Sequence, residues 1–481
     1  MAGKRPILVL QLQRMGDLVL TFPLLLWLGR RYPGHPIWVA AEERFSRQIV
    51  PISPPATYLS WACLRGMLQQ PYEIVINLSH RPEAARLAGS VQAEVVVGPV
   101  EKDGVTYVRG HFQLYRASLV HNNRHNRFHW ADMNALDVIP LAEIAATHFP
   151  PPRHLGSGSR SVGLFVGASQ PEKRPDPSFF ARLADGLVNR GLRPMFFGGP
   201  DDADLARQAR NLSRSKPPNL AGKFDLPGLA KAGQGLAQFI TPDTGPMHLM
   251  AWSGVKTLDL SMGPVNPRET APHASGHAVL QSSLSCVGCW ECHAGLNHLC
   301  RERFQPGRTA TIAHSLVESP APEALRKQVD FESMRFRGLR LFATGRDEDG
   351  LHRLAPLAGQ RPAQARELVS LFWHAAFGAH FGLWEHSRLA TARRQLAEEF
   401  PKLDLALLRA LRGLLRELVD YVKHSAASPA PLPTDFWRSR PPCSRPLAGY
   451  IQLHVENENA SRESLARAVT LVESVLAAWI S

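Results

Sequence analysis

Short apolar runs alternate with longer amphipathic stretches along the first part of the chain. Runs rich in Val, Ile and Leu predict buried strands at Pro6–Leu12, Pro36–Ala40, Tyr72–Leu78 and Glu94–Gly98. Leu18–Tyr32 has the apolar spacing of a helix and lies between the first two strands. Strands that are apolar throughout and alternate with helices indicate a parallel sheet covered on both faces.

The alternation restarts after Pro150–Arg160, a segment rich in Pro, Gly and Ser that is typical of a linker. The strands and helices predicted in this second half are, in order, Ser161–Val166, Pro177–Arg190, Arg193–Phe197, Leu205–Ser213, Ala237–Thr241 and Val255–Leu260. Two similar halves in tandem predict an α/β protein of two doubly wound domains with a cleft between them.

The pattern changes after about Pro320, where clear strand signals stop. Helices are predicted at Ala363–His380, His386–Phe400, Leu403–His424 and Ser461–Ile480, with a proline-rich interruption at Ser428–Pro446. Trp373, Phe377 and Phe381 form an aromatic stripe at helical spacing, which is more often core than interface. We therefore divide the chain into domains at residues 1–155 and 160–317 and a helical extension of unknown role at 318–481.

The composition is that of a folded protein with a sizeable core, because 44% of the 481 residues are hydrophobic and 20% are charged. Lys and Arg number 55 against 42 Asp and Glu, a net charge of +13. Such a balance favours nucleotides, phosphorylated glycans, nucleic acid or an acidic membrane surface as partners. No motif that reads DNA or RNA accompanies the charge, so we do not expect nucleic acid.

The N-terminus superficially resembles a signal peptide, with Lys4 and Arg5 before apolar residues, but Gln11, Arg14 and Asp17 interrupt the run and no small-residue cleavage site follows. No run reaches the roughly 18 apolar residues of a membrane-spanning helix. We expect a cytoplasmic protein, with peripheral contact to the inner membrane allowed by the basic charge.

Four segments in order carry a family resemblance: ILVLQLQRMGDLVLTFPLLL, YEIVINLSHRPEAARLAG, VGLFVGASQPEKRPDP with MFFGGPDD, and ITPDTGPMHLMAWSGV. Together they cover about residues 6–315 and resemble glycosyltransferase family 9, the lipopolysaccharide heptosyltransferases. The resemblance implies a GT-B fold, two Rossmann-like domains facing across a cleft. It also implies transfer of a sugar, usually heptose from ADP-heptose, with inversion and without a catalytic metal.

Asp17 follows a predicted strand at the start of a helix, where open α/β sheets place ligands. An inverting transfer needs a base for the acceptor hydroxyl proton. The resemblance implies that Asp17 is this base, with Gly16 beside the donor. Asp also suits a helix cap, and the two roles are compatible.

Lys173 also follows a strand, and the resemblance implies that it meets the donor phosphate, where its charge would stabilise the leaving pyrophosphate. Ala168 and Ser169 match positions that face the donor. The sequence departs from the family at Arg174–Pro177, where Lys-x-Trp-Pro is more usual. A solvated surface lysine is the simpler alternative.

Asp243, Thr244 and Gly245 open a helix after a strand, so its backbone N–H groups could bind an anion, and the glycine permits close approach. The resemblance implies that this segment holds the donor diphosphate and sugar, whereas a simple N-cap is the alternative. His248, one turn later, would face the same site. A lone histidine is more often structural.

Asp202, or its neighbour Asp201, could bind the donor ribose, and Phe224 matches a residue that walls the nucleotide base. His80 and Arg81 follow a strand of the first half and could meet an acidic or phosphorylated acceptor. A basic cluster comprises His121, Arg124, His125, Arg127 and His129, most of which we expect to be solvated.

Four of the six cysteines, Cys286, Cys289, Cys292 and Cys300, read C-x2-C-x2-C-x7-C, a spacing that lets thiolates converge on zinc or iron. The cluster is similar to that of the adhesin-modifying branch of the family, whose members bind iron through cysteines. His293 and His298 could replace a ligand. Reduced thiols or a disulfide are the alternatives, and the metal would be structural because the chemistry needs no cofactor.

The sequence thus favours an inverting glycosyltransferase that moves heptose from ADP-heptose to an envelope glycan. Transfer to a protein acceptor such as an adhesin or flagellin is an alternative, as is a non-catalytic nucleotide-sugar-binding scaffold. The retention of Asp17, Lys173 and Asp243 argues against the scaffold. An oligomer fits the sequence as well as a monomer.

Overall fold

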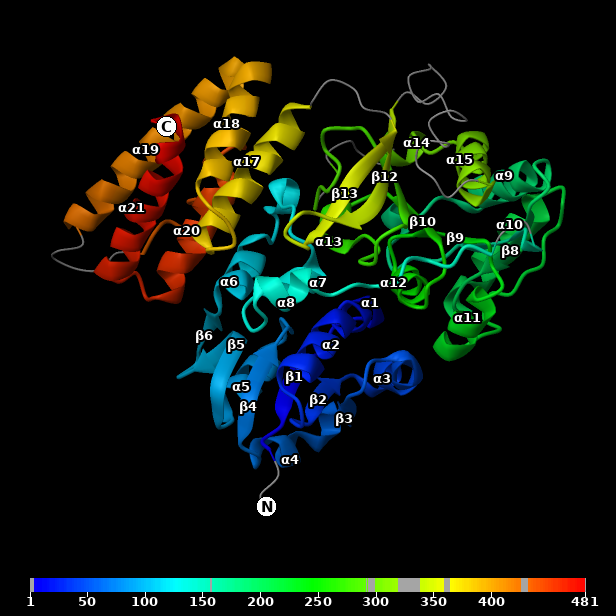
Figure 1. Cartoon of the computed structure of the whole chain (residues 1–481), viewed down its shortest axis with the longest axis horizontal. Helices are drawn as coiled ribbons and strands as arrows, with labels where there is room; N and C mark the ends of the chain where they lie inside the picture. Colours follow the sequence, from blue (N-terminus) through cyan, green and yellow to red (C-terminus); the bar gives the residue numbers. More distant parts are fainter. Residues whose placement is uncertain are drawn as a thin grey trace.

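The structure is a computed structural model that describes residues 4–155, 158–290, 292, 299–318, 338–358, 364–424 and 431–480. Two α/β domains lie side by side, and a bundle of helices formed by the end of the chain lies against the first of them (Figure 1). The predicted fold class of two Rossmann-like domains and a helical extension is confirmed.

The first domain is built on a sheet of six strands in the order β3-β2-β1-β4-β5-β6. Its strands are β1 (Ile7–Gln11), β2 (Ile37–Ala41), β3 (Thr57–Ser60), β4 (Tyr72–Asn77), β5 (Ala93–Lys102) and β6 (Val105–Arg109). All pairs are parallel except β5 with β6. In β1, Ile7 and Val9 join the core on one face while Leu8 and Leu10 join the core on the other, which explains the unbroken apolar run.

The second domain has a seven-stranded sheet in the order β13-β12-β11-β10-β9-β7-β8. Its strands are β7 (Ser161–Phe165), β8 (Arg193–Phe197), β9 (Gln238–Pro242), β10 (Thr257–Ser261), β11 (Ala278–Ser282), β12 (Leu339–Arg346) and β13 (His352–Ala358). The last two strands form an antiparallel hairpin on the edge of β11.

This hairpin corrects the expectation that strands stop after Pro320. In β12, Leu339 and Leu341 are buried on one face while Arg340 points the other way, so the run alternates over a few residues only. An amphipathic strand of this length gives a weaker signal than the apolar parallel strands. The purely helical part of the described chain therefore begins at α17, not before β12.

Helices cover both sheets. Those of the first domain are α1 (Met15–Val19), α2 (Phe22–Arg31), α3 (Glu43–Ile49), α4 (Leu64–Leu68), α5 (Pro82–Ser90), α6 (His111–Ser118), α7 (Trp130–Met133) and α8 (Leu141–Ala145). Those of the second are α9 (Pro177–Val188), α10 (Ala203–Leu212), α11 (Leu226–Gly233), α12 (Gly245–Trp252), α13 (Pro267–Thr270), α14 (Leu299–Glu302) and α15 (Pro306–Glu318). The extension contains α17 (Ala365–His380), α18 (Ser387–Glu399), α19 (Pro401–His424), α20 (Arg445–Asn457) and α21 (Arg462–Leu476).

The extension shares a hydrophobic core with the first domain. The predicted aromatic stripe packs in the core, as expected. The ring centre of Phe377 lies 4.5 Å from that of Tyr115 on α6, and the ring centre of Phe381 lies 4.6 Å from that of Phe112. Asn457 of α20 accepts from the N–H of Val108 at 2.5 Å and donates to its carbonyl at 3.0 Å. This pairing covers part of the open edge of β6.

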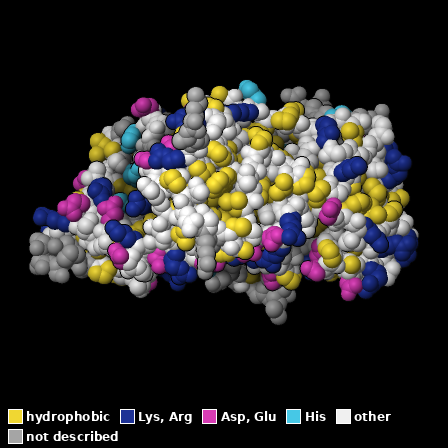
Figure 2. All heavy atoms as spheres, turned by 90° about the horizontal axis from the view of Figure 1, so that it is seen from below, with side chains coloured by type: hydrophobic (Ala, Val, Ile, Leu, Met, Phe, Trp, Pro, Cys, Tyr) yellow, Lys and Arg dark blue, Asp and Glu magenta, His cyan; other side chains and the backbone are white. Residues whose placement is uncertain are grey.

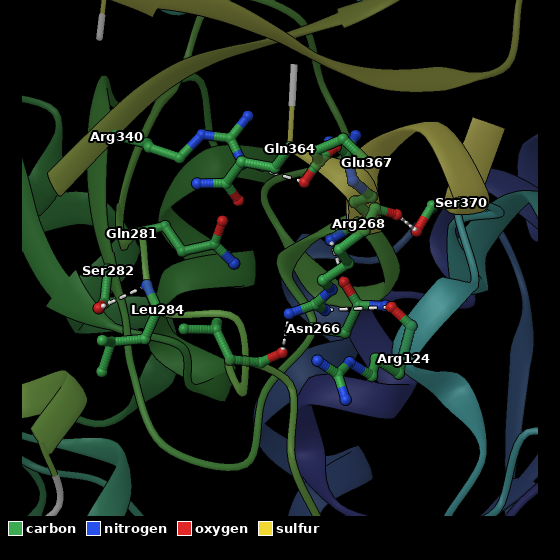
Figure 3. Close-up of a pocket in the computed structure, with 12 residues that line it drawn as sticks. Arg124, Asn266, Arg268, Gln281, Ser282, Leu284, Arg340, Gln364, Glu367 and Ser370 are labelled. Carbon is green, nitrogen blue, oxygen red and sulfur yellow. Dashed lines mark hydrogen bonds and ion pairs between the residues drawn. The ribbon is translucent and has the colours of Figure 1, made fainter. Parts of the chain in front are cut away.

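One carboxylate joins the three parts of the molecule. Glu367, at the start of α17, accepts from Arg127 of the first domain at 3.2 Å and from Arg268 and Arg340 of the second at 2.5 and 3.0 Å. The two arginines of the second domain and Glu367 line a small polar cavity (Figure 3). The arginines hold the pKa of Glu367 far below its usual range against the effect of burial.

The exterior does not gather its basic side chains in one place on the face drawn in Figure 2, where lysines and arginines are scattered among acidic and apolar side chains. None of the described helices combines the length and apolar character needed to cross a bilayer.

Substituting Glu367→Gln should lower the free energy of unfolding by about 3 kcal/mol, because three partly buried arginines would lose their shared carboxylate. Urea denaturation of the full chain measures this. The matched change Glu398→Gln, at an exposed position of α18, should alter stability by less than about 0.5 kcal/mol. Equal effects of the two substitutions would contradict a joining role for Glu367.

Candidate active site

The two sheets bring their strand ends together where the strand order reverses. In the first sheet β1 lies between β2 and β4, and in the second β7 lies between β8 and β9. Such points open a crevice at the carboxyl ends of the strands. Asp17 follows β1, Ser169 follows β7 and Asp243 follows β9, so the predicted residues are placed at both crevices.

The helix starts that carry these residues meet at two glycines. A Cβ atom on Gly16 would lie 3.3 Å from Cα of Gly245 and from Cδ2 of His248. A Cβ atom on Gly245 would lie 2.5 Å from Cε of Met15 and 3.1 Å from the backbone nitrogen of Gly16. A Cβ atom at either position would press on the other helix start, so the two glycines favour this close approach of α1 to α12, which brings the two domains into one site.

Asp17 lies at the centre of this contact. Its Oδ2 accepts from the backbone N–H of Arg14 at 3.2 Å, so it does cap the first turn of α1. Burial raises the pKa of the Asp17 carboxyl, while the charges of Arg116, Arg14 and Lys173 lower it. A carboxylate with a raised pKa is a stronger base than one in water.

Lys173, at the end of the short turn Pro171–Lys173, connects the residues of the two crevices. Its charge lowers the pKa of both Asp17 and Asp243, although burial has the larger, opposite effect on each. Thr270 donates to Oδ2 of Asp243 at 2.5 Å. Lys173 is half-buried, and its charge therefore acts at both crevices.

Thr244 and His248 flank the start of α12. The Thr244 hydroxyl donates to the carbonyl of Pro242 at 3.2 Å. Its side chain makes no capping hydrogen bond to α12, although Thr244 is the N-cap residue of this helix. His248 is buried, and no partner for its Nδ1 is found in the described part of the chain. Burial lowers the pKa of His248 to about 3, with His129 and Lys173 adding to the effect.

Asp202 and Asp201 are distinguished by their surroundings. Asp201 is exposed, whereas Asp202 lies against the end of β7, where a Cβ on Gly167 would fall within 2.5 Å of its carboxylate. Its Oδ2 accepts from the N–H of Gly199 at 2.8 Å. Asp202 thus lies beside Gly167 at the same sheet edge and also closes the turn Pro200–Asp202 that it ends.

Phe224 is 38% exposed and stacks on Phe197 at the end of β8, with the ring centres 6.1 Å apart. Ser169 accepts from the guanidinium of Arg14 at 3.1 Å, a hydrogen bond between the two domains. The predicted donor-side residues therefore extend from Asp17 along the edge of the second sheet.

Two residues near Asp17 were missed from the sequence. Arg116 of α6 is buried, donates to Asn134 at 3.0 Å, and its charge acts on both Asp17 and Glu269. Glu269 accepts from Asn123 at 2.6 Å and from Asn126 at 2.9 Å, and burial raises its pKa to about 8. For Arg116, the one signal in the sequence was a charged residue within the aromatic segment HFQLYRAS.

The acceptor-side predictions have different outcomes. The charge of Arg116 acts on His80 as well as on Asp17. Arg81 instead forms ion pairs with Glu42 and Glu83 of its own domain. These two carboxylates partly neutralise the charge of Arg81.

The expectation of a mostly solvated basic loop is wrong for His125, Arg127 and His129. His125 is buried and hydrogen-bonds Ser370 of the extension at 3.2 Å. His129 is buried and hydrogen-bonds the carbonyl of Ala271 in the second domain at 2.9 Å. The loop is a junction between the domains, and tertiary contacts rather than water satisfy its polar groups.

The four clustered thiols influence one another. Burial raises the pKa of Cys289 and Cys300, and Cys286 and Cys292 raise both further. Among the described residues, however, no three His, Cys, Asp or Glu side chains are arranged to hold a metal ion, and His293 and His298 lie outside these residues. The described residues therefore give no support to the predicted zinc or iron site.

The sequence model of glycosyltransferase family 9 (heptosyltransferase) matches residues 60–298, which include Lys173 and Asp243. Over these residues, just under half of the chain, the sequence is that of a glycosyltransferase family 9 domain. The match ends before the helical extension, so the five helices α17–α21 lie outside the family domain.

Three curated heptosyltransferases are similar to the chain, two over about half of their own length and one over 99% of it. Lipooligosaccharide heptosyltransferase 2 of Campylobacter jejuni is 29% identical over 177 residues, 36% of this chain and 55% of that enzyme. The chain spans about half of the length of this relative and of its counterpart from a second strain. Lipopolysaccharide heptosyltransferase 1 of Pseudomonas aeruginosa is 23% identical over 66% of this chain and 99% of that enzyme.

Among solved structures, Escherichia coli ADP-heptose lipopolysaccharide heptosyltransferase II is similar with a TM-score of 0.49 and 17% identity, over 65% of this chain and 98% of that one.

The pH dependence of unfolding should report the buried histidine of this family 9 site. The unfolded chain takes up a proton at His248 near pH 6.5, but the folded chain does so only near 3. Stability therefore falls as the pH drops between these values. From about pH 7.5 to about pH 5 the wild type should lose about 2 kcal/mol of unfolding free energy relative to His248→Gln. Parallel stability curves for the two proteins would refute a buried, neutral His248.

Proposed function

We propose that the protein is an inverting heptosyltransferase that moves heptose from ADP-heptose to a hydroxyl group of a lipopolysaccharide or related envelope glycan. The observation that carries the proposal is the meeting of Asp17 with Lys173 and Asp243 across the domain junction. The curated relatives compared above are heptosyltransferases of lipooligosaccharide and lipopolysaccharide by name, which supports the choice of sugar and acceptor class.

Asp17 is the general base of this reaction. Its carboxylate accepts the proton of the acceptor hydroxyl while that oxygen forms a bond to the anomeric carbon of heptose. The bond from the anomeric carbon to the diphosphate oxygen breaks, and its electron pair leaves with ADP. Attack from the face opposite the leaving group inverts the anomeric centre.

The leaving diphosphate gains negative charge as this bond breaks, and positive groups held in place stabilise that charge. Lys173 supplies a full charge, and the backbone N–H groups at the start of α12 supply partial ones. Arg14, bonded to Ser169 across the junction, adds a second cation beside the same crevice.

The nucleoside end of the donor would lie along the edge of the second sheet. In this proposal Asp202 accepts from ribose hydroxyls and the exposed ring of Phe224 stacks on the base, which the position of Asp202 beside Gly167 and the exposure of Phe224 support. The neutral, buried His248 and the carboxylate of Asp243 would contact the transferred sugar.

Substituting Lys173→Ala should weaken ADP-heptose binding about tenfold to a hundredfold, because a charge-assisted contact to phosphate is lost. Isothermal calorimetry with ADP-heptose, ADP and UDP-sugars measures this. Lys231→Ala, an exposed lysine of α11, is the control and should bind like the wild type. A preference for UDP-sugars would refute the proposed donor, and failure to bind any of them would refute the enzyme.

Asp17→Asn should lower kcat by about 10²–10⁴-fold and leave ADP-heptose affinity nearly unchanged, because the amide keeps the shape of the side chain but cannot take the proton. In the wild type kcat should rise with pH until Asp17 is ionised. The assay is ADP release with deacylated lipopolysaccharide lacking heptose as acceptor, with an adhesin protein as the alternative acceptor. A variant that retains more than about a third of wild-type kcat would show that Asp17 is not the base.

A further inference from the structure

A pocket of about 440 Å³ lies at the junction of the three parts of the molecule, and Asp17 is not among its lining residues. Its walls come from all three parts of the molecule: the loop around Asn123 in the first domain, the cysteine loop at Trp290 in the second, and the segment around Trp437 in the extension. Its volume is in the range of sites that hold a small molecule. None of the residues that line the pocket takes part in the proposed reaction.

The charge of the pocket is of one sign. Arg124, Arg438 and Arg445 line it, and none of its described lining residues is acidic. Arg445 donates to backbone carbonyls, and Arg124 donates to the carbonyl of Ser285, so in the described chain no carboxylate neutralises them. Three guanidinium groups without a carboxylate partner in the described chain favour binding of a phosphate or carboxylate in the pocket. Arginine can bind either group through two parallel hydrogen bonds.

The pocket also offers flat apolar surfaces. Trp290 is 46% exposed, and its ring packs at a tilt against the ring of His121, with the ring centres 4.7 Å apart. Trp437 lies on the extension side, with the guanidinium of Arg438 5.4 Å from its ring centre. Aromatic faces with a polar rim suit a ligand that is part apolar and part polar, and a pyranose ring has this character.

The walls are held in position before any ligand arrives. Trp290 donates through its indole N–H to Asn123 at 2.9 Å, and Asn122 donates to the carbonyl of Arg445 at 3.0 Å. A preformed site loses little conformational entropy on binding. These two bonds tie the cysteine loop and the extension to the same loop of the first domain.

Buried polar groups connect the pocket to the surroundings of Asp17. Asn123 lines the pocket and donates to Glu269, and the charge of Arg116 acts on both Glu269 and Asp17.

We propose that this pocket binds a sugar unit carrying a phosphate or carboxylate group, as a remote subsite for the acceptor glycan. The assignment to the acceptor rests on the function proposed above, whereas binding of the charged sugar does not. The extension then has a function: it completes an acceptor subsite that residues 60–298 alone would leave open.

Binding is tested without donor by calorimetry on the full chain with glucose 1-phosphate, glucuronate, glucose and inorganic phosphate. Both charged sugars should bind, glucose should not, and phosphate should bind more weakly than glucose 1-phosphate. Arg438→Gln should weaken the binding of both charged sugars about tenfold, and Trp290→Leu should weaken it several-fold. Arg409→Gln, the same change at an exposed position of α19, should have no effect.

Failure of glucose 1-phosphate to bind the wild type, or equal binding by Arg438→Gln, would overturn the site. Equal affinity for phosphate and glucose 1-phosphate would overturn the sugar part of it. The source is decided with deacylated lipopolysaccharide: a higher KM with unchanged kcat in Arg438→Gln supports the acceptor, and an unchanged KM refutes it. ADP-heptose binding by the variants should equal that of the wild type, so a failure of the donor assignment would be seen separately.

Discussion

The contact between two helix starts at Gly16 and Gly245 is the constraint on which the site depends. Each glycine leaves room for the backbone of the other, and a single Cβ on either side would press on the opposite helix start. Because α1 belongs to the first domain and α12 to the second, the contact places a carboxylate from one beside a lysine and a carboxylate from the other. Neither domain alone contains this arrangement.

The junction that maintains this contact is polar and buried. Glu269 joins the second domain to Asn123 and Asn126, His273 pairs with Asp132 at 2.9 Å, and Glu367 ties both domains to α17. Buried polar groups that are fully hydrogen-bonded favour one arrangement, because any shift leaves several of them unsatisfied. The extension therefore acts on the relative position of the two domains as well as on the core of the first.

Part of the positive charge of the chain lies in this interior. Arg116 is buried and Arg127 and Arg366 are partly buried, and burial lowers the pKa of each. Arg116 offsets part of the rise in the pKa of Asp17, and Arg127 meets Glu367. The net charge of +13 thus says less about an external polyanion than about an interior built from arginine.

Local pattern alone determined the apolar strands β1, β2, β4, β5 and β7–β10 and the positions of Asp17, Lys173 and Asp243 after strands, because apolar strands and helix starts are encoded by adjacent residues. It did not determine β3, β6 and β11, nor the β12–β13 hairpin, whose alternation is short. It also did not reveal the tertiary contacts of His125, Arg127 and His129, which looked like a solvated loop. Arg116 and Glu269 were invisible for the same reason. Their roles depend on partners more than a hundred residues away, and only the packing of three separate parts decides which charges meet.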